Sequence, residues 1–193
     1  NNLQVRELVI FGYRTNSDGI NVCNSQTAAI SDCFVRTGDD LFSAKTLGRN
    51  PDAICDNVTF QNCIGWAGKA RCYGITGEVN ATISNVTFKD CAVIYRDATW
   101  DNNFLGSLVV TVETGGADIS NITFENIEIF KDFGRAINCT VYDSGITGCA
   151  IRGIHLRNIT CDFALKSKLC AATGANSLSV TFGGVRFNGV TLN

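Results

Sequence analysis

Several residue types are nearly missing from this chain of 193 residues. It has no methionine, a single proline and a single histidine, and only 18% of its residues are charged. With 45% hydrophobic residues and 19 glycines, this composition argues against a disordered or coiled-coil chain and favours a compact, β-rich body. The length fits one domain, which we expect to span residues 1–193.

Long runs of one residue kind are missing as well. The net charge is −2 and lysine and arginine do not cluster, so nucleic acid and anionic membranes are not expected partners. No stretch of about 18 apolar residues could span a bilayer, and there is no positively charged start followed by an apolar run. No CxxC pair suits zinc and no glycine loop has the spacing that cradles phosphates, so we expect no metal and no cofactor.

Cysteine and N-glycosylation sequons are abundant. Ten cysteines predict an oxidising compartment and three or four disulfides, although some could instead be small hydrophobes inside the core. The sequons predict a secreted protein, but an asparagine in a repeated phrase could equally serve turn geometry. The six candidate glycosylation sites are Asn57, Asn80, Asn85, Asn121, Asn138 and Asn158.

One short phrase recurs along the chain. It reads ICDNVTFQNC at 54–63, ISNVTFKDC at 83–91, ISNITFENI at 119–127 and IRGIHLRNITC at 151–161. Short β-branched runs separated by Gly, Asn and Asp, at a period of about 22 to 36 residues, are typical of a parallel β-helix whose coils stack about 4.8 Å apart. Helical repeats would need longer amphipathic segments, and an antiparallel sandwich would not explain the recurring phrase.

The repeats give about seven coils. The first residues already look like a coil strand, with no polar capping element before them. We therefore expect this chain to be the C-terminal part of a longer β-helix, whose N-terminal coils are missing, cleaved off or carried by another chain.

Acidic residues occur at turns one coil apart. RTNSDGINV (14–22) contains Asp18, and VRTGDDLFSAK (35–45) contains Asp39 and Asp40, the first of them 21 positions after Asp18. In a parallel stack such residues lie side by side, so the three carboxylates should converge. Repulsion between them would keep one protonated as a general acid while the others activate water, as glycoside hydrolysis requires. The alternatives are plain turn formation and a calcium site.

At NSDG, GDD and SNVTF the sequence resembles the polygalacturonase family and the related dextranase and isopullulanase family. The resemblance covers most of the chain. It implies an inverting glycosidase on a right-handed parallel β-helix, with Asp39 as general acid and with Asp18 and Asp40 as the pair that holds and deprotonates water.

The chain departs from polygalacturonases at two motifs. Lys69 in GKARCYG (68–74) stands where their Gly-His-Gly histidine falls, and their cationic Arg-Ile-Lys strand corresponds to the apolar LVVTV of 108–112. A uronate carboxylate would then lack charge-assisted partners. We therefore expect a neutral glucan, as in dextranase-like enzymes, rather than polygalacturonate.

Further residues are candidates for substrate binding. Trp66 and Tyr73 could stack on sugar rings or fill the core, and Lys45 could bind substrate, support an ionised aspartate or be solvated. The full set of substrate-binding candidates is Lys45, Trp66, Lys69, Arg71, Tyr73 and Glu78. The single histidine, His155, lies far along the stack and is expected to be structural.

The sequence thus predicts a secreted glycoside hydrolase that acts on a polysaccharide. A structural or adhesive extracellular β-helix without turnover is the first alternative, and a polysaccharide lyase with the same fold is the second. The geometry of Asp18, Asp39 and Asp40 relative to an open groove separates these interpretations.

Overall fold

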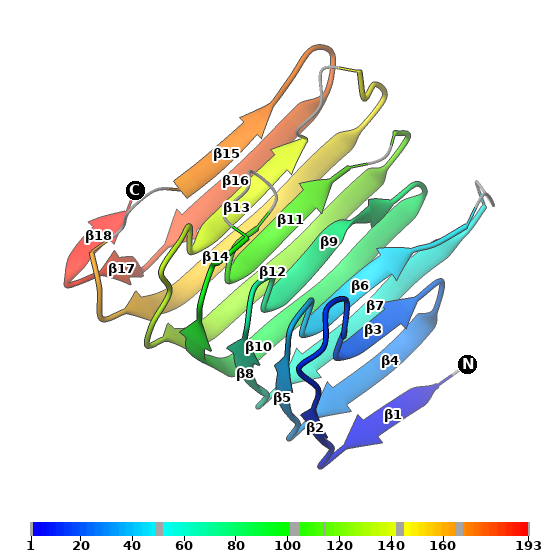
Figure 1. Cartoon of the computed structure of the whole chain (residues 1–193). Coiled ribbons are helices and arrows are strands. Elements are labelled where there is room, and N and C mark those ends of the chain that lie inside the picture. Colours follow the sequence, from blue (N-terminus) through cyan, green and yellow to red (C-terminus); the bar gives the residue numbers. More distant parts are fainter. Residues whose placement is uncertain are drawn as a thin grey trace.

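The chain forms a stack of parallel β-strand coils in a computed structural model (Figure 1). The structure describes residues 2–48, 52–100, 105–113, 115–141, 145–164 and 168–192. In these ranges no helix is long and apolar enough to span a membrane.

Two sheets wrap around one core. A twelve-stranded sheet contains β1 (Leu3–Arg6), β2 (Val9–Phe11), β4 (Gln26–Ser31), β5 (Phe34–Thr37), β7 (Ile54–Gln61), β8 (Ile64–Ala67), β10 (Thr82–Arg96), β12 (Asp118–Ile129), β14 (Ala150–Cys161), β16 (Ser177–Gly183), β17 (Val185–Phe187) and β18 (Val190–Leu192). A six-stranded sheet contains β3 (Ile20–Cys23), β6 (Phe42–Thr46), β9 (Tyr73–Val79), β11 (Leu108–Val112), β13 (Ile137–Val141) and β15 (Lys168–Ala172).

The coils that begin at β1 to β14 each visit both sheets in turn, whereas β16, β17 and β18 at the C-terminal end all belong to the larger sheet. Neighbouring strands pair in parallel, with β17 and β18 as the antiparallel exception among the described strands. Strands β1, β4, β7, β10, β12, β14 and β16 follow one another across the larger sheet, which gives the predicted seven coils. The parallel β-helix predicted from the repeated phrase is confirmed.

The recurring phrase is the unit that builds the core. Phe88 pairs in register with Phe60 on one side and with Phe124 on the other, and Phe124 pairs with Leu156. The three rings are buried and stack with centroids 4.8 and 5.1 Å apart. Aligned rings of this kind bury apolar area on every coil and fix the register between coils.

The asparagine of the phrase has a structural role. Asn57, Asn85 and Asn121 lie in the left-handed region, with φ of 54°, 53° and 54°, a conformation that asparagine tolerates well. The Asn121 amide donates to the side chain of Asn85 (2.6 Å), and the Asn85 amide donates to Asp56 (2.8 Å). We call this row of three residues the asparagine ladder.

Two predictions from polar residues need correction. Asn138 is fully buried, and its amide donates to the Leu105 carbonyl oxygen, so it is not available for glycosylation in the folded chain. The predicted disulfides are wrong, because nine cysteines are free thiols, eight of them buried: Cys23, Cys33, Cys55, Cys63, Cys72, Cys91, Cys139, Cys149 and Cys161. These thiols act as small core side chains, so cysteine number no longer supports an oxidising compartment.

Candidate active site

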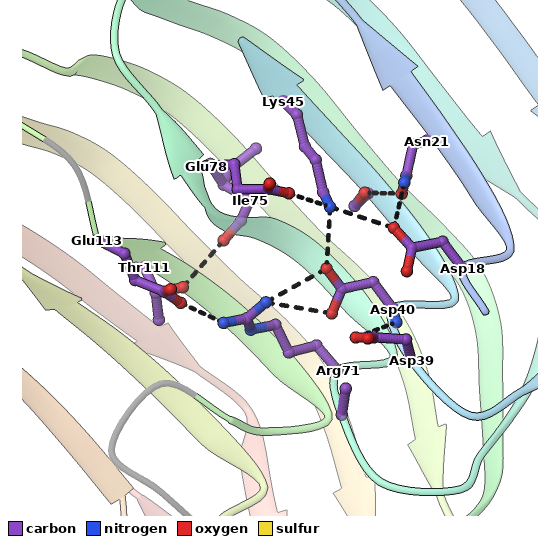
Figure 2. Close-up of polar contacts among 12 residues, drawn as sticks. Asp18, Asn21, Asp39, Asp40, Lys45, Arg71, Ile75, Glu78, Thr111 and Glu113 are labelled. Atoms are coloured by element: carbon purple, nitrogen blue, oxygen red, sulfur yellow. Dashed lines mark hydrogen bonds and ion pairs between the residues drawn. The ribbon is translucent and has the colours of Figure 1, made fainter. Parts of the chain in front are cut away.

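A pocket of about 490 Å³ opens over the smaller sheet, beside the loops that lead into β3, β6 and β9 (Figure 2). It is lined by Asn16, Asp18, Asp39, Asp40, Lys45, Ala70, Arg71, Glu78, Trp100, Leu105 and Glu113. All three aspartates predicted from the coil spacing are therefore brought into one pocket.

Strand register explains why Asp18, Asp40 and Arg71 meet. Phe42 pairs with Ile20 on one side and with Tyr73 on the other, and each of the three site residues lies two positions before one of these paired residues. The backbone continues the ladder here, since Gly19 N–H donates to the Asp40 carbonyl oxygen (2.7 Å). We call Asp18, Asp40 and Arg71 the charged column.

Lys45 joins the carboxylates of this column. Its ammonium nitrogen lies 3.3 Å from Asp18 Oδ2, 3.2 Å from Asp40 Oδ2 and 2.7 Å from Glu78 Oε2. The lysine is only 3% exposed, so the solvated lysine considered above is wrong. Burial alone would lower the pKa of Lys45, but Asp40, Glu78 and Asp18 raise it above its ordinary value, so the side chain stays charged.

A bulge in β9 brings Glu78 to this lysine. Ala44 pairs with Ile75 and Thr46 pairs with Val79, so Lys45 on β6 faces a longer segment of β9 that includes Glu78. Such a bulge re-aims side chains, as is common beside functional sites. Gly77 within it has φ of 73°, and a Cβ there would overlap the side chain of Glu113.

Asp40 is the most enclosed carboxylate of the three. It is 2% exposed, and besides Lys45 it contacts Arg71 Nη1, which lies 3.3 Å from both of its oxygens. The other terminal nitrogen of Arg71 pairs with Glu113. Asp40 is therefore paired with two cations.

Asp39 has the opposite electrostatic setting. Burial raises the pKa of this carboxyl above its ordinary value, and the neighbouring charges of Asp40 and Asp18 raise it further. The Asp40 N–H, which donates to Asp39 Oδ1 at 3.0 Å, and Arg71 oppose this shift only in part. A carboxyl with a raised pKa beside carboxylates that are paired with cations is the arrangement that general acid and base chemistry needs.

Asp18 keeps one oxygen available. Its described side-chain contacts, from Asn21 Nδ2 (2.6 Å) and from Lys45, both use Oδ2 (Figure 2). Asn21 is itself oriented by a hydrogen bond from the Ser43 hydroxyl. Asp18 is thus anchored through one oxygen while Oδ1 can accept a hydrogen bond from a water molecule.

The pocket is strongly acidic overall. It contains five carboxyl groups and two cationic groups, and both cations already form ion pairs with those carboxylates. Lys45 and Arg71 also contact the oxygens that a calcium ion would need, which argues against the calcium alternative. In the described ranges no group of three or more His, Cys, Asp or Glu side chains is arranged so that it could hold a metal ion.

Three predicted binding residues do not line the pocket. Tyr73 is fully buried, stacks on Phe42 at 5.0 Å and donates its hydroxyl to backbone carbonyl oxygens, so its predicted role in substrate binding is wrong. Trp66 lies on the outer side of β8 under the Arg36 guanidinium, 4.3 Å from its ring centroid. Lys69 contacts the pocket only indirectly, through the ring of Trp100 at 5.1 Å.

Other lining residues were not anticipated. Trp100 and Leu105 come from the loop between β10 and β11, and Glu113 follows β11 two coils away from Asp40. Aligning VVTVE (109–113) with GITGE (74–78) on the preceding coil would have indicated that Glu113 belongs near Glu78. His155 hydrogen-bonds Thr181 on neighbouring coils (2.8 Å) and does not line this pocket.

The chain matches several curated proteins that are named as polygalacturonases. The chain is 27% identical over 147 residues to a probable endopolygalacturonase D of Neosartorya fischeri, covering 75% of this chain and 28% of the relative. It is 32% identical over 116 residues to polygalacturonase-2 of Solanum lycopersicum (59% and 22%) and 25% identical over 150 residues to endopolygalacturonase I of Aspergillus niger (76% and 37%). The matched region thus spans well under half of each relative.

No solved structure gives a significant match. The family model described as "Glycosyl hydrolases family 28" matches residues 1–191, nearly the whole chain. By this match, the chain belongs to glycosyl hydrolase family 28.

Proposed function

We propose that this chain carries the catalytic centre of an inverting glycoside hydrolase that cleaves a neutral glycan. The observation that carries the proposal is the convergence of Asp18, Asp39 and Asp40 in one pocket with opposite electrostatic settings. Family membership supports the reaction class.

Asp39 is the proposed general acid. Its raised pKa favours the protonated form, which gives its proton to the glycosidic oxygen as the bond from that oxygen to the anomeric carbon breaks. The leaving sugar departs as a neutral alcohol. The carboxylate left behind has Arg71 nearby to stabilise its negative charge.

Asp18 is the proposed general base. Water attacks the anomeric carbon from the face opposite to the leaving group, and its proton passes to Asp18 Oδ1. Both oxygens of Asp40 already contact cations, so this carboxylate orients the water and the charged side chains instead. Attack by water in one displacement inverts the anomeric configuration.

The substrate is proposed to be neutral because the pocket is acidic. The curated relatives carry polygalacturonase names, which would favour a polymer of uronic acids. In this chain both pocket cations are already paired, and Glu78 and Glu113 add negative charge around the three aspartates. A uronate would be repelled there, whereas the hydroxyls of a neutral sugar can donate hydrogen bonds to the same carboxylates.

The test is reducing-sugar release from dextran, pullulan, nigeran and polygalacturonate, with the wild-type chain and with Asp39→Asn. Asp118→Asn is the matched control, since Asp118 is an exposed aspartate paired with Arg152 outside the pocket. We expect hydrolysis of a neutral polymer that Asp39→Asn abolishes and Asp118→Asn retains. Hydrolysis of polygalacturonate alone would contradict the neutral substrate, and equal activity of wild type and Asp39→Asn would contradict the catalytic assignment.

We also propose an extracellular location, where a polymeric glycan is accessible. The sequons other than Asn138 remain candidates for glycosylation, including Asn80 and Asn158. Mass spectrometry of protein secreted by a eukaryotic host would identify occupied sites, and a glycan on Asn138 in folded protein would contradict the burial of that side chain.

A further inference from the structure

A continuous row of aromatic and cationic side chains crosses the coils beside the catalytic pocket. It consists of Tyr13, Arg36, Trp66, Tyr95 and Phe133, which we call the aromatic stripe. These residues lie on the outer side of β5, β8, the second half of β10, and the segments next to β2 and β12. Figure 1 shows β2, β5 and β8 side by side at one edge of the coil stack.

Strand register aligns the stripe. Arg36 pairs in register with Trp66, and Trp66 pairs with Tyr95 on the next coil. Their neighbours in sequence, such as Val35 and Ala67, are fully buried, so the alternation of the strand turns the stripe residues outward. The coil stack therefore repeats an aromatic or cationic group on one outer face.

Each member of the stripe packs on the next. The Arg36 guanidinium lies 5.6 Å from the Tyr13 ring centroid and 4.3 Å from that of Trp66. Trp66 and Tyr95 have centroids 5.9 Å apart, and Tyr95 and Phe133 are 5.6 Å apart. Mutual packing holds the rings in place, which lowers the entropy lost when a ligand binds them.

Arg36 has unused hydrogen-bonding capacity. Its Nε is buried and has no hydrogen-bond partner among the described residues, and the side chain forms no ion pair in that part of the chain. It also lines a hollow of about 340 Å³ together with Phe11, Gly12 and Tyr13. Tyr13 is 66% exposed and Phe11 is 69% exposed, so the rings of this hollow are open to a ligand.

The stripe begins at the edge of the catalytic pocket. A side-chain carbon on Gly68 would lie 3.2 Å from the Tyr13 ring and 3.3 Å from the Cα of Gly38, so Tyr13 and the loop that carries Asp39 both border Gly68. On the same stretch of chain, Lys69 packs on Trp100, which lines the pocket. A polymer that extends past the pocket over this edge meets Tyr13 and Arg36 first.

We propose that the aromatic stripe binds the same glycan chain as the catalytic pocket, outside the cleavage site. Ring faces stack on the apolar faces of pyranoses, and Arg36 donates hydrogen bonds to their oxygens. The coil step of about 4.8 Å is comparable to the length of one sugar unit in an extended chain, so successive coils can meet successive sugars. This inference rests on the proposed function for the identity of the polymer.

Binding is tested separately from hydrolysis by electrophoresis in native gels containing dextran, pullulan, nigeran or polygalacturonate. The proteins are wild type, Asp39→Asn, Trp66→Ala, Tyr95→Ala and the exposed control Ile54→Ala on β7. We expect one polymer to retard wild type, Asp39→Asn and Ile54→Ala alike. The stripe variants should bind that polymer about tenfold more weakly, the loss that corresponds to about 1.4 kcal/mol.

Folding of the variants is checked by thermal unfolding. Trp66→Leu keeps an apolar side chain under Arg36 but removes the aromatic face, so it replaces Trp66→Ala if that variant fails to fold. Unchanged retardation of the folded stripe variants, or no retardation of wild type by any of the four polymers, would overturn the proposal. Retardation that depends on the stripe, without hydrolysis of any polymer, would support the stripe and contradict the proposed hydrolase.

Discussion

The asparagine ladder and the charged column are both rows of polar side chains stacked one coil apart. The ladder repeats one residue type, and its amides donate hydrogen bonds to side chains of the preceding coil, from Asn121 to Asn85 and from Asn85 to Asp56. The column places Asp18, Asp40 and Arg71 at matching positions, with Lys45 and Asp39 beside them. One row is chemically uniform and the other changes from coil to coil.

The difference separates structure from function in a repeat protein. Asparagine recurs at the positions equivalent to Asn85 because the backbone there has a left-handed φ, a conformation that asparagine tolerates well. A row of charged residues has no such backbone role. It also costs folding free energy, because adjacent carboxylates repel each other and burial penalises their charge. Its presence indicates that the site is selected for chemistry.

The largest expected effect comes from Asp39→Asn. Losing a general acid should lower kcat by about 10²- to 10⁴-fold on a hydrolysed glycan. Because the folded pKa of Asp39 is raised above 3.8, ionisation costs the folded state free energy, and stability falls as pH rises from about 3.8 through the folded pKa. The neutral variant should therefore melt at an equal or higher temperature at pH 7, as measured by calorimetry; a lower melting temperature would contradict the raised pKa.

Lys45→Met removes the cation between the carboxylates of the column. Breaking a buried ionic cluster on one side should cost about 3–5 kcal/mol in unfolding free energy at neutral pH. Since the folded pKa of Lys45 is raised, its contribution is fully present below pH 10.5 and is lost as pH rises through the folded value. In the folded variant kcat/KM should also fall, because Asp18 and Asp40 lose the cation that holds them in place.

Lys89→Met is the control for this variant, since Lys89 is a partly exposed lysine on β10 outside the pocket. It should change neither kcat/KM nor the stability appreciably. An unchanged kcat/KM in folded Lys45→Met would show that the column does not prepare its carboxylates for catalysis.

Asn85→Ala tests the ladder by the same two readouts. It removes the hydrogen bonds to Asp56 and from Asn121 and places alanine at a φ of 53°, so unfolding free energy should fall by about 1–2 kcal/mol with kcat unchanged. Asn85→Gly permits the same φ without the hydrogen bonds and should lose less. A large loss of kcat in either folded variant would break the distinction between the two rows.

The smallest effect is expected from reductant. The buried cysteines are free thiols, so adding dithiothreitol should shift the melting temperature by less than about 2 °C. A drop of many degrees would indicate disulfides, each of which typically contributes about 2–5 kcal/mol.

Coil stacking was predictable because the repeated phrase encodes register directly. Phe60, Phe88 and Phe124 pair as the repeat indicated, and a separation of one coil brought Asp18 to Asp40. Features that interrupt the repeat were not predictable. The β9 bulge that delivers Glu78 leaves no pattern in a single sequence, and Trp100 comes from a connecting loop.

Errors arose where two environments favour the same residue type. Tyr73 follows Arg71 by two positions, but Arg71 lies in the loop before β9, whereas Tyr73 begins that strand and is buried in the core. Cysteines are equally suited to disulfides and to tight interior columns, so their number could not decide between them. Asn138 has a sequon but faces a buried site that tertiary contacts with Leu105 create.

The most direct test is the NMR titration of the Asp39 side-chain carboxyl in the wild-type protein and in Asp40→Asn. The account predicts a pKa above the ordinary 3.8 in the wild type and a lower pKa in the variant, where one neighbouring negative charge is gone and Arg71 remains. A wild-type pKa at or below 3.8, or no change on removing the Asp40 charge, would contradict the claim that unlike charges on neighbouring coils prepare Asp39 to act as an acid.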